Sequence, residues 1–258
     1  ISVNKDGTTR YDMTQLPITH FKPGEIGTSV EELKELGYEK DVNGIELTNT
    51  EQVLELKFQD IILPKCEDAP ELGADKILYK VSLFIDELLD LLYNQEKFYR
   101  LKSEKELTGQ LVVALAPHTS AGIVGRIIGF SRTQGFYAHP LFHAATRRDC
   151  DGDEASVTLL MDALLNFSRE FLPDSRGSTQ DAPLVLTSIL VPTEVDDMAF
   201  DMDVAKRYPI EFYEATQNYE MPWNVKVDRL GGLLHSENKN GIFYTHPVSS
   251  INMGVRCS

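Results

Sequence analysis

Cysteine is scarce in this 258-residue sequence, and long apolar runs are missing. The three cysteines, Cys66, Cys150 and Cys257, lie far apart and without Cys-x-x-Cys spacing. We therefore expect neither a zinc site nor a disulfide framework. We also expect the protein to work in a reducing compartment. No run approaches the ~20 apolar residues that a membrane span requires, and no signal-peptide pattern opens the chain. These absences predict a cytoplasmic domain that makes no membrane contact.

Acidic residues are absent from one long stretch, Leu107–Arg148, although the chain holds 40 of them and carries a net charge of −15. Simple proportion gives roughly six or seven acids in a stretch of this length. A buried sheet would exclude acids, but it would not retain the stretch's four arginines. We interpret it as a core whose polar edge faces phosphate. The predicted phosphate-binding side chains are Arg126, Arg132, Arg147, Arg148, His139 and His143.

Three aspartates follow this stretch at alternate positions: Asp149, Asp151 and Asp153, with Gly152 before the last. Alternate residues of an extended or looped backbone point to one side, and carboxylates held that close repel one another unless a cation neutralises them. The spacing predicts a site for Mg²⁺, or for Mn²⁺ as its substitute. A solvated acidic loop is the alternative.

Two familiar motifs fail on these residues. An EF-hand loop needs glycine at its sixth position and glutamate at its twelfth, but counting from Asp149 those positions hold Glu154 and Leu160. A phosphotransferase of the haloacid-dehalogenase type has Asp-x-Asp-Gly-Thr after an apolar strand. Here Asp153 replaces the threonine, and the preceding residues are Ala144-Ala145-Thr146-Arg147-Arg148 rather than an apolar strand.

The loop resembles, position for position, the Asp-x-Asp-Gly-Asp loop of the double-psi-barrel polymerases. Its flanks are similar to the large, catalytic subunit of the archaeal family-D DNA polymerase. The stretches that carry this resemblance are Tyr11–Thr14, Pro17–Phe21, Ala116–Phe130, Tyr137–Ala145, Asp181–Val185 and Pro209–Thr216. The family has asparagine where this chain has Asp149, whereas aspartate there matches the related RNA polymerase loop.

The resemblance implies an α+β fold, a six-stranded double-psi β-barrel with helical insertions. We expect one domain over residues 1–258, with a helical insertion near 64–106 and the metal loop at 147–154. The domain would be a fragment of a longer subunit and would carry its second barrel. We expect it to be inactive when isolated.

The function implied is that of a DNA-directed DNA polymerase, a nucleotidyltransferase, with Asp151, Asp153 and Asp149 as catalytic metal ligands. Its partners would be primer–template DNA, deoxynucleoside triphosphates and a small exonuclease subunit, in the nucleoid-associated cytoplasm. The alternative is a non-catalytic DNA-binding or subunit-docking module with a metal-stabilised loop.

Periodicity and breakers predict the local structure. Residues 1–24 indicate turns, with Asp6-Gly7 in a hairpin, and residues 41–63 favour one or two strands. We expect helices at Ser29–Gly37, Leu78–Tyr99 and Ala155–Leu172, the last with the metal loop at its N-terminus. Pro140 disfavours a regular helix through His139 and His143, and hence a metal pair on one helical face, so we interpret both as phosphate-binding or core hydrogen-bonding groups. Leu111–Leu115, Leu184–Val191 and a C-terminal hairpin near Gly241–His246 are predicted as strands, and Ile123–Phe130 as either strand or helix.

A second group of acids lacks tight spacing and a glycine turn, and we expect it to be a solvated loop rather than a second metal site. Its members are Glu194, Asp196, Asp197, Asp201 and Asp203.

Overall fold

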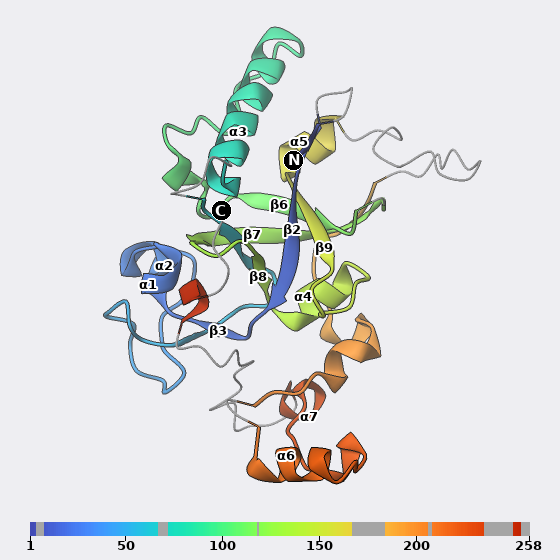
Figure 1. Ribbon diagram of the computed structural model, residues 1–258. Coiled ribbons are helices and arrows are strands. Elements are labelled where there is room, and N and C mark those ends of the chain that lie inside the picture. Colours follow the sequence, from blue (N-terminus) through green and yellow to red (C-terminus); the bar gives the residue numbers. More distant parts are fainter. Residues whose placement is uncertain are drawn as a thin grey trace, which may run out of the picture.

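The central sheet closes on itself as a barrel. The computed structural model describes residues 1–3, 8–66, 72–117, 119–166, 184–205, 208–234 and 250–253. Six strands pair in the order β2–β8–β5–β7–β6–β9, and β9 pairs back with β2 (Figure 1). They are β2 (Thr9–Pro17), β5 (Asp60–Pro64), β6 (Leu111–Leu115), β7 (Ala121–Ser131), β8 (Phe136–Ala138) and β9 (Glu154–Leu159).

Strand direction is mixed. β2 runs parallel to β8 and β5 parallel to β7, whereas β2–β9, β5–β8, β6–β7 and β6–β9 are antiparallel. Parallel neighbours need long crossover connections, which a simple meander does not have. The closed mixed barrel with few helices confirms the α+β double-psi fold. Three pairings lie outside the barrel. β1 (Ser2–Val3) pairs antiparallel with β2, β10 (Val185–Thr187) pairs parallel with β7, and β3 (His20–Phe21) pairs antiparallel with β4 (Leu54–Glu55).

Period-2 alternation divides the strand residues between the barrel interior and its outer layers. In β6, Val112 and Ala114 join the main core, while Val113 and Leu115 pack outward with Ala163. In β5, Ile61 and Leu63 face the main core and Ile62 faces a second one. That second core lies under α1 (Pro23–Ile26) and α2 (Val30–Glu35).

The helix predicted at Ser29 is confirmed, because Ser29 Oγ accepts a hydrogen bond from the Glu32 amide at 3.2 Å and the Glu32 carboxylate accepts from the Ser29 amide at 2.9 Å. The long helix α3 spans Ala74–Leu91, so it begins earlier and ends earlier than predicted. After the helix the backbone turns at Asn94, whose φ is 51°. The Asp86 carboxylate then accepts hydrogen bonds from the amides of Phe98, Tyr99 and Arg100, which holds the returning chain against the helix. The short helix η1 (Glu104–Leu107) follows within the predicted insertion.

Three predictions of secondary structure are wrong. Residues 9–17 are a nine-residue strand, not turns. The predicted helix from Ala155 begins as β9, and α5 covers only Leu160–Asn166. The reason is that Ala155, Val157 and Leu159 also fit period 2, and the strand gains backbone partners on both sides, in β2 and β6. The core strand predicted at 184–191 is limited to β10, whose Val185 is 57% exposed.

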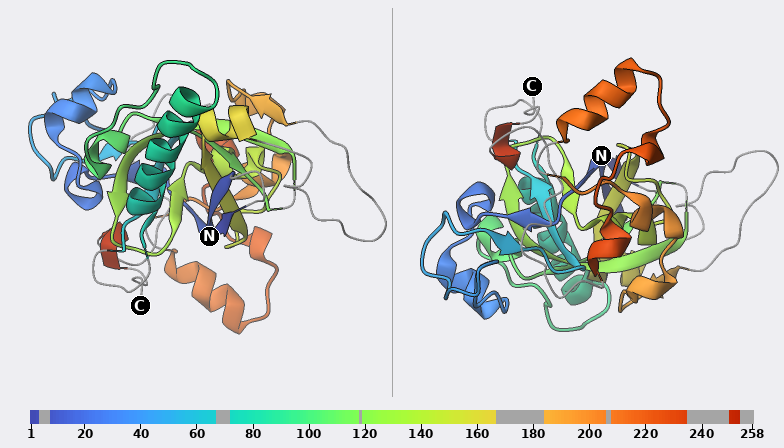
Figure 2. Two further views of the ribbon diagram at one scale, coloured as in Figure 1. Left: turned by 90° about the horizontal axis from the view of Figure 1, so that it is seen from above. Right: turned by 90° about the horizontal axis from the view of Figure 1, so that it is seen from below.

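The C-terminal segments lie outside the barrel (Figure 1). They are η3 (Pro192–Glu194), η4 (Asp197–Asp201), α6 (Ile210–Gln217), η5 (Pro222–Asn224), α7 (Leu230–Leu234) and η6 (Ile251–Met253). Both views of Figure 2 show α6, in orange, beside the barrel. The predicted turn at Asp6-Gly7 and hairpin at Gly241–His246 lie outside the described residues. Of the helices described, none is both long and apolar enough to cross a membrane.

The cysteine prediction is partly wrong, since Cys66 is disulfide-bonded, whereas Cys150 is a free thiol. Burial, followed by the charges of Asp149 and Asp151, raises the pKa of the Cys150 thiol to about 12. Its Sγ lies 3.5 Å from the Pro140 carbonyl oxygen. The thiol therefore stays protonated at neutral pH and is a poor ligand or nucleophile.

Candidate metal and phosphate site

The helix α4 (Pro140–Ala145) delivers the chain to the aspartate loop. As expected, no regular helix runs through both histidines, because Pro140 occupies the first helical position, where no amide donor is needed, and His139 before it has an extended backbone. His139 is the N-cap, and its Nδ1 accepts a hydrogen bond from the Leu141 amide at 3.2 Å. His143 lies inside the helix.

Arg147 follows the C-cap of α4, Thr146, and has left-handed backbone geometry, with φ of 61°. Its amide donates to the Ala144 carbonyl at 2.9 Å, which closes the last turn. Glycine is the usual residue at such a position, because a side chain there costs about 1–2 kcal/mol. The chain thus keeps a guanidinium at this position despite local strain.

The loop then turns at Gly152, whose φ of 104° suits only glycine. Immediately after this turn, the Gln15 amide in β2 donates to the Asp153 carbonyl at 2.8 Å. The β2–β9 ladder starts beside it, with Thr14 opposite Glu154. The main chain of Asp153 is therefore fixed to the barrel, whereas the turn before it projects outward.

The three predicted metal ligands lie on one loop. Asp149 and Asp151 are exposed, and Asp153 is partly buried. The Asp153 carboxylate lies 3.7 Å from Arg148 Nη1, with both side chains about 40% exposed (37% for Arg148, 40% for Asp153). Within the described ranges, no three His, Cys, Asp or Glu side chains converge closely enough to hold a metal ion. The donor type still suits a hard cation, since Mg²⁺ prefers carboxylate oxygens and keeps several waters.

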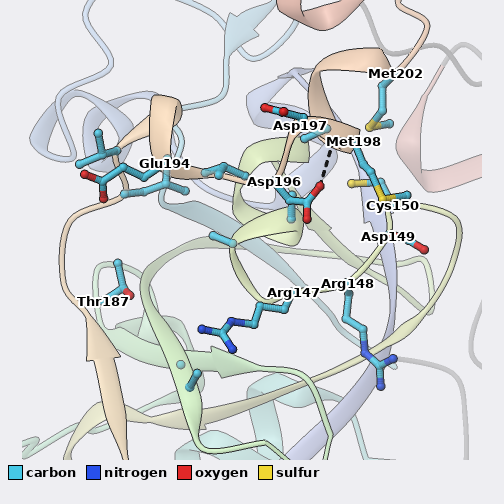
Figure 3. A pocket seen from close by; sticks show the side chains of 18 of the residues that line it. Arg147, Arg148, Asp149, Cys150, Thr187, Glu194, Asp196, Asp197, Met198 and Met202 are labelled. Carbon is cyan, nitrogen blue, oxygen red and sulfur yellow. Dashed lines mark hydrogen bonds between the residues drawn. The ribbon is translucent and has the colours of Figure 1, made fainter.

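A cavity of about 980 Å³ opens beside the loop. Residues 147–151 line one side, together with Ala121 and Gly122 at the start of β7, and the segment around β10, η3 and η4 lines the other. Figure 3 shows Arg147 and Arg148 extending in different directions, with Asp196 and Asp197 on the far side of the cavity. The Asp196 carboxylate accepts from the Met198 amide at 3.1 Å.

The structure thus places part of the second acidic group, Glu194, Asp196 and Asp197, in the same cavity as Arg147. Sequence reasoning missed this proximity, because over 40 residues separate the two segments and no local pattern connects them. The group lies in short 3-10 helices at the cavity wall. Its negative charge lies across the cavity from Arg147 and Arg148.

Arg126 and Arg132 do not line this cavity. Arg126 is held by Asp60, with Nε–Oδ1 and Nη2–Oδ2 distances of 2.9 and 2.8 Å, and its Nη2 also donates to the Leu36 carbonyl at 3.0 Å. Hydrogen bonding to Asp60 raises the Arg126 pKa above its ordinary value. Arg132 is exposed, and its amide donates to Asn252 Oδ1 at 2.9 Å.

His139 and His143 are buried, at 4% and 0% exposure. The His139 ring packs edge-on against Phe58, and the His143 ring against Phe136, with centroids 4.7 and 5.1 Å apart. Burial lowers the pKa of His139 to about 3 and that of His143 to about 4. Both imidazoles are therefore neutral and packed in the core, which argues against direct contact with phosphate.

Replacing His139 by asparagine should make the domain more resistant to acid. Asparagine can still accept the Leu141 amide, but it does not titrate. With a folded pKa of about 3 against an ordinary 6.5, the unfolded chain binds a proton first as the pH falls. The contribution of His139 to the free energy of unfolding is therefore fully present above pH 6.5 and is lost as the pH falls below this value. Between pH 7 and pH 5 the variant should lose about 2 kcal/mol less than the wild type. Urea unfolding at both pH values measures this, and equal losses would contradict it.

The barrel and its Asp-x-Asp-Gly-Asp loop define a double-psi barrel domain of the polymerase type. The family model described as "DNA polymerase II large subunit DP2, catalytic domain" matches residues 1–258, so the chain belongs to this family. Similar proteins are the DNA polymerase II large subunits of Archaeoglobus fulgidus (54% identical over 259 residues), Methanococcus vannielii (50% over 261) and Pyrococcus furiosus (51% over 264). The matches cover 98–100% of this chain but only 20–22% of these relatives.

Proposed function

We propose that this domain supplies the metal-binding and phosphate-binding part of a DNA polymerase active site, for metal-dependent nucleotidyl transfer during replication. The observation that carries the proposal is the aspartate loop, fixed to β2 at Asp153 and bordering the cavity that Arg147 also lines. The family and the printed names of the relatives support it.

Asp151 and Asp153, with Asp149, would hold Mg²⁺, or Mn²⁺ as a substitute, through carboxylate oxygens. When bound, the cation would neutralise phosphate charge and lower the pKa of a primer 3′ hydroxyl. The chain's own contribution is positional. The β2 contact holds Asp153 in place, the Gly152 turn presents Asp151, and Arg148 balances the Asp153 charge before a cation arrives.

Arg147 is the residue we assign to the phosphates of a deoxynucleoside triphosphate or of the template strand. A guanidinium binds phosphate with two parallel hydrogen bonds. Arg132 remains a proposed contact to the DNA backbone outside the cavity. Arg126, His139 and His143 we assign to the fold instead, because their contacts are with Asp60 and with core aromatic rings.

The complete polymerase would act on primer–template DNA and assemble with a small exonuclease subunit in the nucleoid-associated cytoplasm. Because the chain spans about a fifth of the relatives' length, we expect the isolated domain to be inactive.

Arg147→Ala and Arg147→Gly, made in the full-length subunit, test this function. Both remove the guanidinium, so each should reduce primer extension by roughly 10²-fold and lower the slope of log affinity against log salt by about one. Only the glycine variant relieves the strain at φ of 61°, so it should be more stable than the alanine variant by about 1 kcal/mol. Extension assays, DNA titrations at several salt concentrations and thermal unfolding measure the three quantities.

Arg132→Ala is the matched control, since it removes an exposed arginine outside the cavity. It should alter DNA affinity and leave the extension rate at saturating DNA unchanged. A non-catalytic docking module predicts a different result: the Arg147 variants would keep their salt dependence and fail only in assembly with a partner subunit.

A further inference from the structure

One buried residue, Gln15 in β2, contacts the residues at both ends of the aspartate loop, one through its backbone and one through its side chain. Its backbone amide donates to the Asp153 carbonyl at 2.8 Å, and its side-chain Nε2 donates to Thr146 Oγ at 3.1 Å. Gln15 is 0% exposed and Thr146 is 1% exposed. The intervening residues, 147–152, make up the projecting turn with Arg147, Asp149 and Asp151.

Thr146 is itself fixed by α4. Its hydroxyl donates to the His143 carbonyl at 2.6 Å, so its one proton is used, and it can only accept from Gln15. The contact therefore requires a donor at position 15 and a hydroxyl at position 146. It links strand β2 to the end of α4, close to the start of β9. Gln15 and Thr146 are 131 residues apart in the sequence.

Fold stability alone does not explain an amide at position 15. Gln15 Oε1 is buried without a hydrogen-bond partner in the described structure. A buried unpaired acceptor is destabilising, and an apolar side chain of the same shape would remove that cost. The amide is retained at the site where it sets the spacing between Thr146 and Asp153.

We propose that Gln15 is a positioning residue of the metal site. Its backbone amide holds the Asp153 end of the loop and its side chain holds the Thr146 end, so the side chain completes the pair of contacts that sets the distance over which Asp151 and Asp153 must meet to share one cation. The inference rests on the proposed function, because it presumes that these aspartates bind the metal. It concerns the side chain only, since the backbone bond from residue 15 to Asp153 persists in any variant other than proline.

The test uses Gln15→Met, Thr146→Val, their double variant and Thr146→Ser in the full-length subunit. Mn²⁺ affinity is measured by electron paramagnetic resonance, as the binding that Asp151→Asn abolishes. We expect the Gln15→Met and Thr146→Val variants each to weaken this binding roughly 10-fold, as loss of an outer contact to a metal ligand does. The double variant should be no weaker than either single variant, because both remove one interaction. Thr146→Ser keeps the hydroxyl and should bind as the wild type does.

Two further measurements separate positioning from folding. Gln15→Met should leave the metal-free melting temperature within a few degrees of the wild type and should shift the midpoint of Mg²⁺-dependent primer extension upward by the same roughly 10-fold. A lowered melting temperature with unchanged Mn²⁺ affinity would overturn the inference and leave Gln15 a structural residue. Wild-type Mn²⁺ binding and extension in Asp151→Asn would instead overturn the proposed function.

Discussion

Replacing Asp151 or Asp153 by alanine or asparagine in the full-length subunit should abolish primer extension, with a loss of at least roughly 10³-fold. Removing a charged metal ligand costs several kcal/mol of transition-state stabilisation. The asparagine variants keep the side-chain volume, so they isolate the charge. DNA affinity should change little, because phosphate contacts to arginine provide most of it.

Two matched variants sharpen this expectation. Asp149→Asn installs the asparagine that the sequence resemblance implies for this position, and should cost less than the change at Asp151 or Asp153. Asp197→Asn removes a carboxylate from the opposite side of the same cavity and should leave extension within about threefold, well below the loss of a metal ligand. Primer extension with saturating Mg²⁺ compares the variants directly. Near wild-type rates for both the Asp151 and Asp153 variants would place the metal elsewhere.

Among the substitutions considered, the removal of Asp60 should lower the free energy of unfolding most. Its carboxylate is 4% exposed and accepts two hydrogen bonds from Arg126, at 2.9 and 2.8 Å, and one from the Tyr38 hydroxyl at 2.5 Å. These contacts join the loop after α2, β5 and β7. Asp60→Ala leaves Arg126, 28% exposed, without its counter-ion, and breaking such a pair costs about 3 kcal/mol.

The double variant Asp60→Leu with Arg126→Met should be more stable than either single variant, because two matched apolar side chains leave no uncompensated charge. Tyr38→Phe should cost only about 1 kcal/mol, the value of one hydrogen bond. Urea unfolding, followed by circular dichroism, measures the free energy of unfolding of Asp60→Ala, of the double variant, of its two single variants and of Tyr38→Phe. Should Arg126→Met also weaken DNA binding under conditions where the domain stays folded, Arg126 would return to the phosphate-binding set.

Residues close together in the sequence determined several features of this protein. The Asp-x-Asp-Gly-Asp spacing, the glycine required at φ of 104° and the Ser29 capping box all lie within a few residues. The acid-free stretch likewise predicted a buried sheet with a polar edge, and β6, β7 and β8 lie in it. Signals of this kind depend on side-chain size, backbone freedom and hydrogen bonds between near neighbours, so the sequence shows them directly.

Tertiary structure alone decided the rest. Residues 154–159 fit a helical period as well as a strand period, and pairing with β2 and β6 selected the strand. His139 and His143 became core groups because α4 packs on the barrel, and Arg126 became a structural cation because Asp60 lies across the β5–β7 pair. Gln15 at the base of the loop contacts Thr146, and Asp197 lies across the cavity from Arg147; in both pairs the two residues are far apart in the sequence. Contacts between residues far apart leave no periodic signal, so only the closed barrel, which brings those residues together, reveals them.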